Sequence, residues 1–159
     1  MFCWDTHLTK IKGRNVLFIV NASNCYTIAM TDIEPRNWNY YAMYIIRVIH
    51  GMMQEMGYSE EQIEQYFKMS GDTTITKTHG RKSVGGINRM VMDAQYFGKK
   101  LEKEAKYQWE LSEYLNRDIC QPEGFDAYGY PSELFKLDME RLGICLLYTS
   151  PSPRDSTSS

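Results

Sequence analysis

The alternation of apolar and polar residues near the N-terminus predicts three antiparallel strands. The expected strands are "FCWDTHLT" (2–9), "RNVLFIVN" (14–21) and "CYTIAM" (25–30), each bounded by residues that favour turns. In the second strand, Val16, Phe18 and Val20 point to one side of the sheet. Leu17 and Ile19 point to the other side, so this strand is apolar on both faces. We therefore expect a meander whose middle strand is buried on both faces.

A helical period replaces the alternation between Trp38 and Met56. Apolar residues recur on one face of this segment at Trp38, Tyr41, Ile45, Val48, Ile49, Met52 and Met56. Gly57 is the expected C-terminal stop. A second helix should begin after Ser59, because Ser59 and Gln62 have the spacing of a capping box, and should end at Gly71.

The remaining pattern predicts one short strand and further helices. "TTITKT" (73–78) has the β-branched content of a strand, and Val84, Ile87, Val91, Ala94 and Leu101 form the apolar face of a long helix interrupted at Gly98. A polar helix with charged i,i+4 pairs is expected from Lys99 to about Asn116, followed by an ordered loop (120–131) and a helix from Pro131 to Leu142. The predicted fold is α+β: a small antiparallel sheet, made of the N-terminal meander plus one short strand, packed against four to five helices.

The composition of the chain disfavours several classes of protein. The formal net charge of −2 gives no overall attraction to nucleic acid, and no apolar run is long enough for a membrane span. Cys3, Cys25 and Cys120 form no C-x-x-C pair, which disfavours a disulfide framework and a zinc ribbon and favours reduced cytoplasmic thiols. His7 and His50 each lack a second ligand nearby. We expect no metal and no cofactor.

The segment "TKTHGRKSVGGIN" (76–88) is the main candidate for a binding site. Lys77, His79, Arg81 and Lys82 lie in a predicted turn before a helix that Ser83 can cap, and Asn88 is expected to fix the start of that helix. Free backbone N–H groups beside cations can hold a phosphate or carboxylate, with Arg81 as the bidentate contact. The ordinary alternative is a tight glycine turn, a serine cap and solvated charges.

The same segment carries a resemblance. T-K-T-x-x-R-x-x-x-G-x-x-N, together with "RNVLFIVNASNCYTIAM" and "GYSEEQIEQYF", resembles an uncharacterised bacterial domain-of-unknown-function family over residues 1–142. The resemblance implies an α+β cytoplasmic domain and assigns no activity. Members of that family usually carry a further element before the tryptophan that Trp4 matches, which implies a truncated N-terminus.

The end of the chain has a different character. One allowed codon choice for "CLLYTSPSPRD" (145–155) reads as a transposase-type sequencing adapter, and "YTSPSPRDSTSS" (148–159) has the composition of a disordered tail. We therefore expect one native domain over residues 1–144 and a non-native tail over residues 145–159, as in a metagenomic fragment.

These observations together favour a non-enzymatic binding or regulatory module without membrane contact. The alternatives are nucleic-acid or phosphate binding through the basic turn 77–83 and a phosphoester or nucleotide-processing enzyme with His79 beside a carboxylate. A third alternative, a protein partner, predicts an exposed apolar patch on the helix that bears Met52, Met53 and Met56.

Overall fold

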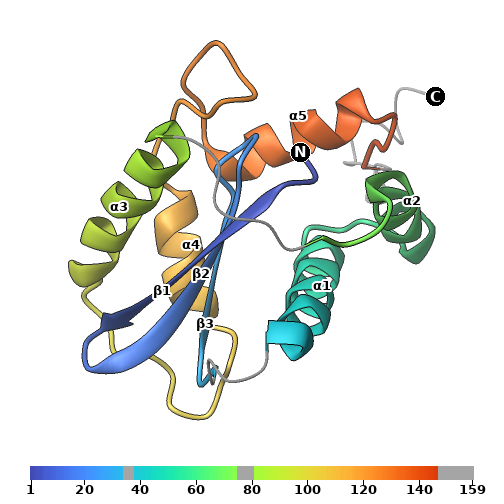
Figure 1. The fold of residues 1–159 in the computed structure, drawn as a ribbon. Coiled ribbons are helices and arrows are strands. Elements are labelled where there is room, and N and C mark those ends of the chain that lie inside the picture. Colours follow the sequence, from blue (N-terminus) through green and yellow to red (C-terminus); the bar gives the residue numbers. More distant parts are fainter. Residues whose placement is uncertain (34–37, 75–80, 147–159) are drawn as a thin grey trace, which may run out of the picture.

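A three-stranded antiparallel sheet lies between two groups of helices in the computed structural model, which describes residues 1–33, 38–74 and 81–146 (Figure 1). The strands are β1 (Trp4–Ile11), β2 (Arg14–Asn21) and β3 (Thr27–Thr31). The helices are α1 (Trp38–Glu55), α2 (Glu60–Ser70), α3 (Arg81–Gln95), α4 (Trp109–Asn116) and α5 (Pro131–Arg141). The expected α+β class is confirmed.

The sheet has the order β1-β2-β3, so the strand that is apolar on both faces is the central one, as predicted. Lys12 and Gly13 join β1 to β2 with φ angles of 51° and 83°, which suit a two-residue hairpin turn. The predicted β2 matches the observed strand. The first strand runs from Trp4 to Ile11 instead of 2–9, and the third begins at Thr27 because Cys25 has a left-handed φ of 61°.

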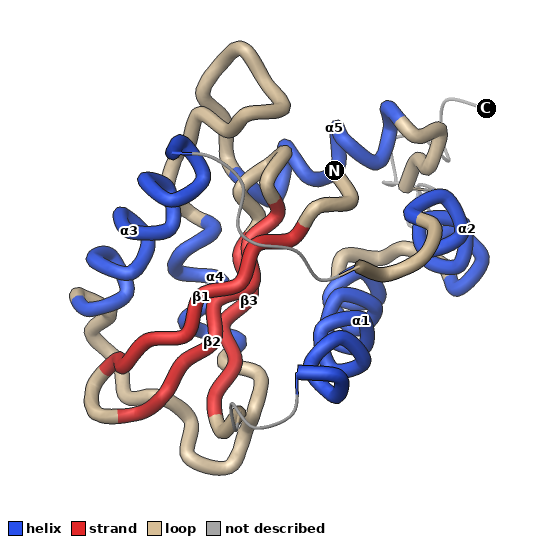
Figure 2. The backbone as a smooth tube through the Cα atoms, viewed as in Figure 1, coloured by secondary structure: helices blue, strands red, loops and turns tan. Residues whose placement is uncertain are grey.

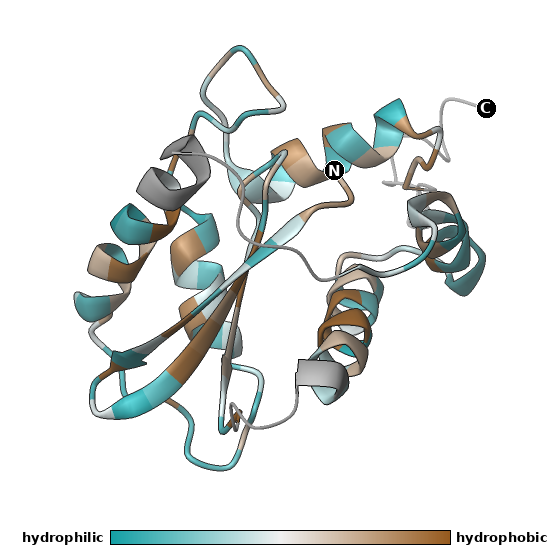
Figure 3. Ribbon diagram, in the orientation of Figure 1, coloured by the Kyte–Doolittle hydropathy of each residue, from teal (hydrophilic) through white to brown (hydrophobic). Residues whose placement is uncertain are grey.

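The two faces of β2 contribute to two separate cores. Leu17 and Ile19 pack with residues of α1, α2 and α5, including the fully buried Met53, Ile63 and Phe135. The alternate residues Val16, Phe18 and Val20 pack with α3 and α4. Figures 2 and 3 show the strands between the two helix groups and the apolar residues along β2 and α1.

The helix signals at residues 38–71 are confirmed. Tyr41, Ile49 and Met52 are buried on the inner face of α1, and Gly57 follows that helix with a φ of 98°. Ser59 caps α2, where Gln62 N–H donates to the Ser59 hydroxyl over 3.2 Å and the Ser59 N–H donates to Oε1 of Gln62 over 2.9 Å.

The predicted helix from Lys99 to Asn116 is wrong over most of its length. Only Trp109–Asn116 is helical, because residues before it pair with the outer edge of β3. Thr31 N–H donates to the Lys106 carbonyl over 2.7 Å and Gln108 N–H donates to the Ala29 carbonyl over 2.9 Å. Charged i,i+4 pairs contribute only about 0.2–0.5 kcal/mol each, so this pairing overrides them.

Two segments fall largely outside the described residues. Thr73 and Thr74 are not in a strand, and the rest of the predicted strand 73–78 lies outside the description, as do residues 147–159. Of the expected non-native tail, Leu146 packs against the core that contains α1 and α2. Among the described residues, no helix has the length and apolar character needed to cross a membrane.

Candidate functional site

The structure describes only some of the residues that were predicted to form a binding site at the basic turn. Lys77 and His79 lie outside the described residues, and for Arg81, Lys82 and Ser83 the structure describes the backbone alone. Because α3 begins at Arg81, Ser83 lies within its first turn and does not precede the helix as a cap. Asn88 is exposed in the middle of α3, so its expected role at the helix start is also wrong.

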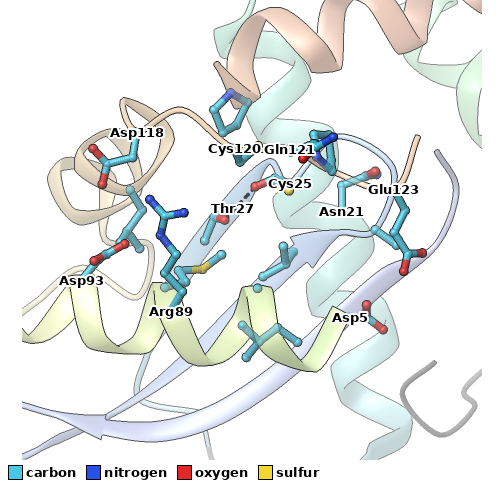
Figure 4. Close-up of a pocket in the computed structure, with 18 of the residues that line it drawn as sticks. Asp5, Asn21, Cys25, Thr27, Arg89, Asp93, Asp118, Cys120, Gln121 and Glu123 are labelled. Carbon is cyan, nitrogen blue, oxygen red and sulfur yellow. Dashed lines mark hydrogen bonds between the residues drawn. The ribbon is translucent and has the colours of Figure 1, made fainter. Parts of the chain in front are cut away.

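The structure instead shows a pocket at one end of the sheet. It encloses about 160 Å³ between α3, the loop that joins β2 to β3, and residues 118–123 after α4 (Figure 4). Val20, Ile87 and Leu115, all buried, belong to its apolar lining. An engineered cavity of about 150 Å³ accepts benzene, so this volume suits a small ligand.

Charged groups of both signs surround the apolar lining. Arg89 extends from α3 into the region bounded by Asp93 and Asp118, and Glu123 lies across the pocket (Figure 4). Within the ranges 1–33, 38–74 and 81–146, no salt bridge engages Arg89. Its guanidinium is therefore placed to contact a ligand carboxylate.

Cys25 reaches the pocket from the loop that joins β2 to β3. Hydrogen bonds stabilise the conformation of this loop. Its N–H donates to the Asn21 carbonyl over 2.9 Å, and its carbonyl accepts from the Thr27 hydroxyl over 3.0 Å. The neighbouring Asn24 accepts from Tyr26 N–H over 2.9 Å through its side-chain oxygen. These bonds hold Cys25 in the left-handed conformation, which costs free energy for a residue with a Cβ.

Cys120 lines the pocket from the loop after α4, and this loop is also held in place. Cys120 and Gly129 exchange two backbone hydrogen bonds of 2.9 Å. Further along the loop, Gly124 N–H donates to the Ser23 carbonyl over 3.0 Å, and the Gly124 carbonyl accepts from Arg141 over 2.8 Å. The two cysteine-bearing loops are therefore tied to each other and to α5.

Cys25 and Cys120 lie at the same end of the pocket (Figure 4). Cys120 Sγ lies 3.9 Å from the Asn24 carbonyl oxygen, and a side-chain hydrogen bond links Cys120 to Cys25. That hydrogen bond is the main reason that the pKa of the Cys120 thiol lies below its usual value. Burial acts in the opposite direction, and the positive charge of Arg89 lowers the pKa further. Cys3, by contrast, is exposed on the chain surface, and partial desolvation together with Asp5 raises the pKa of its thiol.

Two other groups of residues, around Glu60 and around the methionines of α1, stabilise the fold. Glu60 accepts hydrogen bonds from Gln54 and His50, so it links α2 to α1. Met52 and Met53 are buried in the core, and Met56 packs against it. No group of three or more His, Cys, Asp or Glu side chains that could hold a metal ion occurs in the described part of the chain.

The first half of α1 carries an exposed apolar patch, as the hypothesis of a protein partner requires. Tyr40, Met43 and Tyr44 are 61%, 56% and 41% exposed. Lys106 lies 5.1 Å from the centroid of the Tyr44 ring. The patch lies on the other end of the helix from the methionines that suggested it.

No pattern in the sequence indicates the thiol pair. Cys25 and Cys120 are far apart in the chain and form no short motif, so each looks like an ordinary buried thiol. Arg89 likewise looks like a solvated charge on a helix. Only the packing of the loops after β2 and α4 brings these groups together.

Comparison with known proteins identifies one family. The family described as a domain of unknown function (DUF6933) matches residues 1–134. No curated protein and no solved structure matches the chain.

Proposed function

The chain belongs to the DUF6933 family of domains of unknown function, and we propose that it is a non-enzymatic module that binds a small zwitterionic ligand in the pocket beside α3. An α-amino acid with an apolar side chain has the required chemistry. Its carboxylate contacts Arg89, its ammonium group contacts Asp93 or Asp118, and its side chain packs on Val20, Ile87 and Leu115.

The combination of both charges with an apolar lining supports this proposal. Asp93, Asp118 and Glu123 line the same pocket as Arg89, so the carboxylates outnumber the cation there. A polyanion such as nucleic acid would be repelled by this arrangement, whereas a zwitterion satisfies both signs. Small-ligand sites generally combine an apolar wall with a few polar groups that orient the ligand.

Thermal-shift and calorimetric titrations with a panel of L-amino acids test this function. We expect one or more apolar amino acids to raise the melting temperature of the wild-type chain in a saturable manner. Arg89→Ala should weaken that binding by about ten- to one-hundred-fold, because it removes a charge-assisted contact. Arg47→Ala, an exposed change on α1, is the matched control and should leave binding unchanged.

The same titrations include inorganic phosphate and a single-stranded DNA oligonucleotide at low salt. These probes address the alternative in which Lys77, His79, Arg81, Lys82, Ser83 and Asn88 bind an anion. That α3 starts at Arg81 favours this alternative, because its first-turn N–H groups have no helical partners. DNA binding that falls steeply with salt and is lost in Arg81→Ala with Lys82→Ala would replace the zwitterion proposal.

A protein partner is the second candidate, and the exposed patch of Tyr40, Met43 and Tyr44 favours it. A partner that covers this patch would bury large aromatic side chains, which commonly dominate binding energies. Tyr44→Ala should then abolish co-purification of a defined complex from the native host. Tyr96→Ala, a change of an exposed tyrosine directly after α3, is the control and should leave the complex intact.

The cysteine spacing, which contains no C-x-x-C pair, supports a cytoplasmic location for this module, since disulfide frameworks are rare in the reducing cytosol. Fractionation of cells of the native host tests the compartment. The phosphoester or nucleotide-processing alternative depends on His79, outside the described residues, and no described contact favours it.

A further inference from the structure

We propose that Cys25 and Cys120 are a redox modification site, at which small disulfides such as oxidised glutathione, or hydroperoxides, convert the two thiols into a reversible intramolecular disulfide. The proposal is independent of the ligand in the pocket. It requires only that the two sulfur atoms are adjacent, reachable and held by their loops.

The sulfur atoms are adjacent and reachable. Cys120 Sγ lies 3.9 Å from the carbonyl oxygen of Asn24, the residue before Cys25, and a hydrogen bond joins the Cys25 and Cys120 side chains. Both residues line the pocket with partial exposure (Figure 4). A small oxidant therefore has access to them through the same opening as a ligand. The exposed Cys3 shares neither the pocket nor a described thiol neighbour.

The surrounding network keeps the pair together. Asn24 Nδ2 donates to Asp138 over 2.9 Å, Asp138 pairs with Arg141 over 3.1 Å, and Arg141 donates to the Gly124 carbonyl. This chain of contacts connects the Cys25 loop through α5 to the Cys120 loop. Because these contacts hold both loops, the two thiols stay near each other while an oxidant reacts.

Cys120 is the attacking thiol. The hydrogen bond with Cys25 and the nearby charge of Arg89 both lower the pKa of the Cys120 thiol, which favours the reactive thiolate. Asp93, Asp118 and Glu123 line the same pocket and moderate the effect of Arg89. The second thiol, Cys25, is then in position to resolve the first product.

The chemistry balances with either oxidant. With oxidised glutathione, the Cys120 thiolate attacks one sulfur, a mixed disulfide forms and one glutathione thiolate leaves. Cys25 loses its proton and attacks the Cys120 sulfur, which forms the internal disulfide and releases the second glutathione. With a hydroperoxide, the Cys120 thiolate attacks the terminal oxygen and becomes a sulfenic acid, while the O–O bond breaks and the alkoxide leaves as an alcohol after taking up a proton. Cys25 then attacks the sulfenic sulfur, which forms the disulfide and releases water.

Titration of the full chain with oxidised glutathione tests the site. After reduction and desalting, Cys25 and Cys120 of the wild-type chain should lose their thiols together, with a loss of two hydrogens and no glutathione retained on either residue. Peptide mapping after thiol alkylation should find Cys25 linked to Cys120, and dithiothreitol should restore both thiols. Because the bond closes a long loop, the melting temperature of the oxidised chain should rise by roughly 5–10 °C.

Single substitutions separate this pair from ordinary surface thiols. Cys25→Ser should leave Cys120 with a stable glutathione adduct, because the resolving thiol is absent. Cys3→Ser is the matched control and should form the internal disulfide as the wild type does. The proposal is overturned if wild-type Cys120 keeps its glutathione, if linked peptides join different chains, or if Cys120 reacts no faster than Cys3.

Discussion

Asn24 and Arg141 show how single side chains hold the loops of the pocket together. Asn24 is fully buried, and its amide donates to Asp138 on α5. Arg141 donates to Asp138 and to the Gly124 carbonyl, and its guanidinium lies 3.9 Å from the centroid of the Phe125 ring. Phe125, one of the three aromatic residues of the predicted ordered loop, thus anchors that loop.

Gly124 is the residue at which this arrangement is most sensitive. A Cβ at this position would lie 2.7 Å from the Ser23 carbonyl oxygen, which is too close for either backbone to remain in place. We predict that Gly124→Ala lowers the free energy of unfolding by about 1–3 kcal/mol, as overpacking does. Urea denaturation measures the change.

Gly51→Ala provides the control for that experiment. Gly51 lies within α1, and a Cβ there would meet nothing within 4 Å. Because alanine favours a helix over glycine, this change should stabilise the chain by up to about 1 kcal/mol. Equal effects of the two substitutions would contradict the close approach of the Ser23 and Gly124 loops.

At the scale of elements, α4 acts as a polar cover for the edge of β3. Ser112 and Asn116 are buried on α4, and Gln108 is buried directly before it. Ala29 N–H donates to the Ser112 hydroxyl over 3.0 Å. Asn116 accepts from Thr27 N–H and donates to the Thr27 carbonyl, each over 2.8 Å. The helix thereby satisfies backbone groups that a fourth strand would otherwise pair.

Asn116→Ala should therefore destabilise the fold, because it leaves the buried N–H and carbonyl of Thr27 without these partners. We predict a loss of about 2–3 kcal/mol in the free energy of unfolding, measured by chemical denaturation. Glu113→Ala removes only an exposed pair with Arg117 on the same helix and should change stability by less than about 1 kcal/mol. An Asn116 effect as small as the Glu113 effect would show that α4 does not support β3.

The sequence pattern could not reveal this role of α4. Polar residues at 108, 112 and 116 recur with helical spacing, which ordinarily indicates a face in contact with water. The buried side chains contact an edge strand that lies far away in the chain. The error in the helix boundary at Lys99 has the same cause, since pairing with β3 determines where α4 begins.

At the scale of the whole molecule, the core beneath α2 contains phenols that resist ionisation. Tyr66 is 2% exposed, donates to the Met1 carbonyl and accepts from Trp4, each over 3.0 Å. Burial raises the pKa of Tyr66 from 10.0 to about 12, against the lowering effect of the Trp4 hydrogen bond. Burial also raises the pKa of Tyr107 to about 12.

These shifts predict loss of stability in alkali. Between pH 10 and pH 12 the unfolded chain releases phenolic protons that the folded chain retains, so the free energy of unfolding falls as the pH rises through this window. Below pH 10 the contribution is fully present. Urea denaturation across the window measures the slope, which Tyr66→Phe should reduce. Tyr96→Phe, at a ring that is 78% exposed, is the control and should keep the slope.

The identity of residues 145–159 stays a prediction at this scale. Gln62 donates to the Cys145 carbonyl, and the Leu146 side chain would lie 3.7 Å from a Cβ at Gly57, so the first two residues of the segment are packed. Sequencing the gene from genomic DNA with a library that uses no transposase should give a different continuation after Ile144. An unchanged reading frame would refute the adapter interpretation.

The sequence by itself determined the local elements and the family. The meander, the apolar faces of α1, the Ser59 cap and the Pro131 start depend on residues that are close in the chain, so local chemistry is enough to predict them. Only the tertiary structure decided that α4 covers β3, that Arg89 enters a pocket and that Cys25 meets Cys120. These features depend on how distant loops and helices pack across the sheet, and no short motif encodes such contacts.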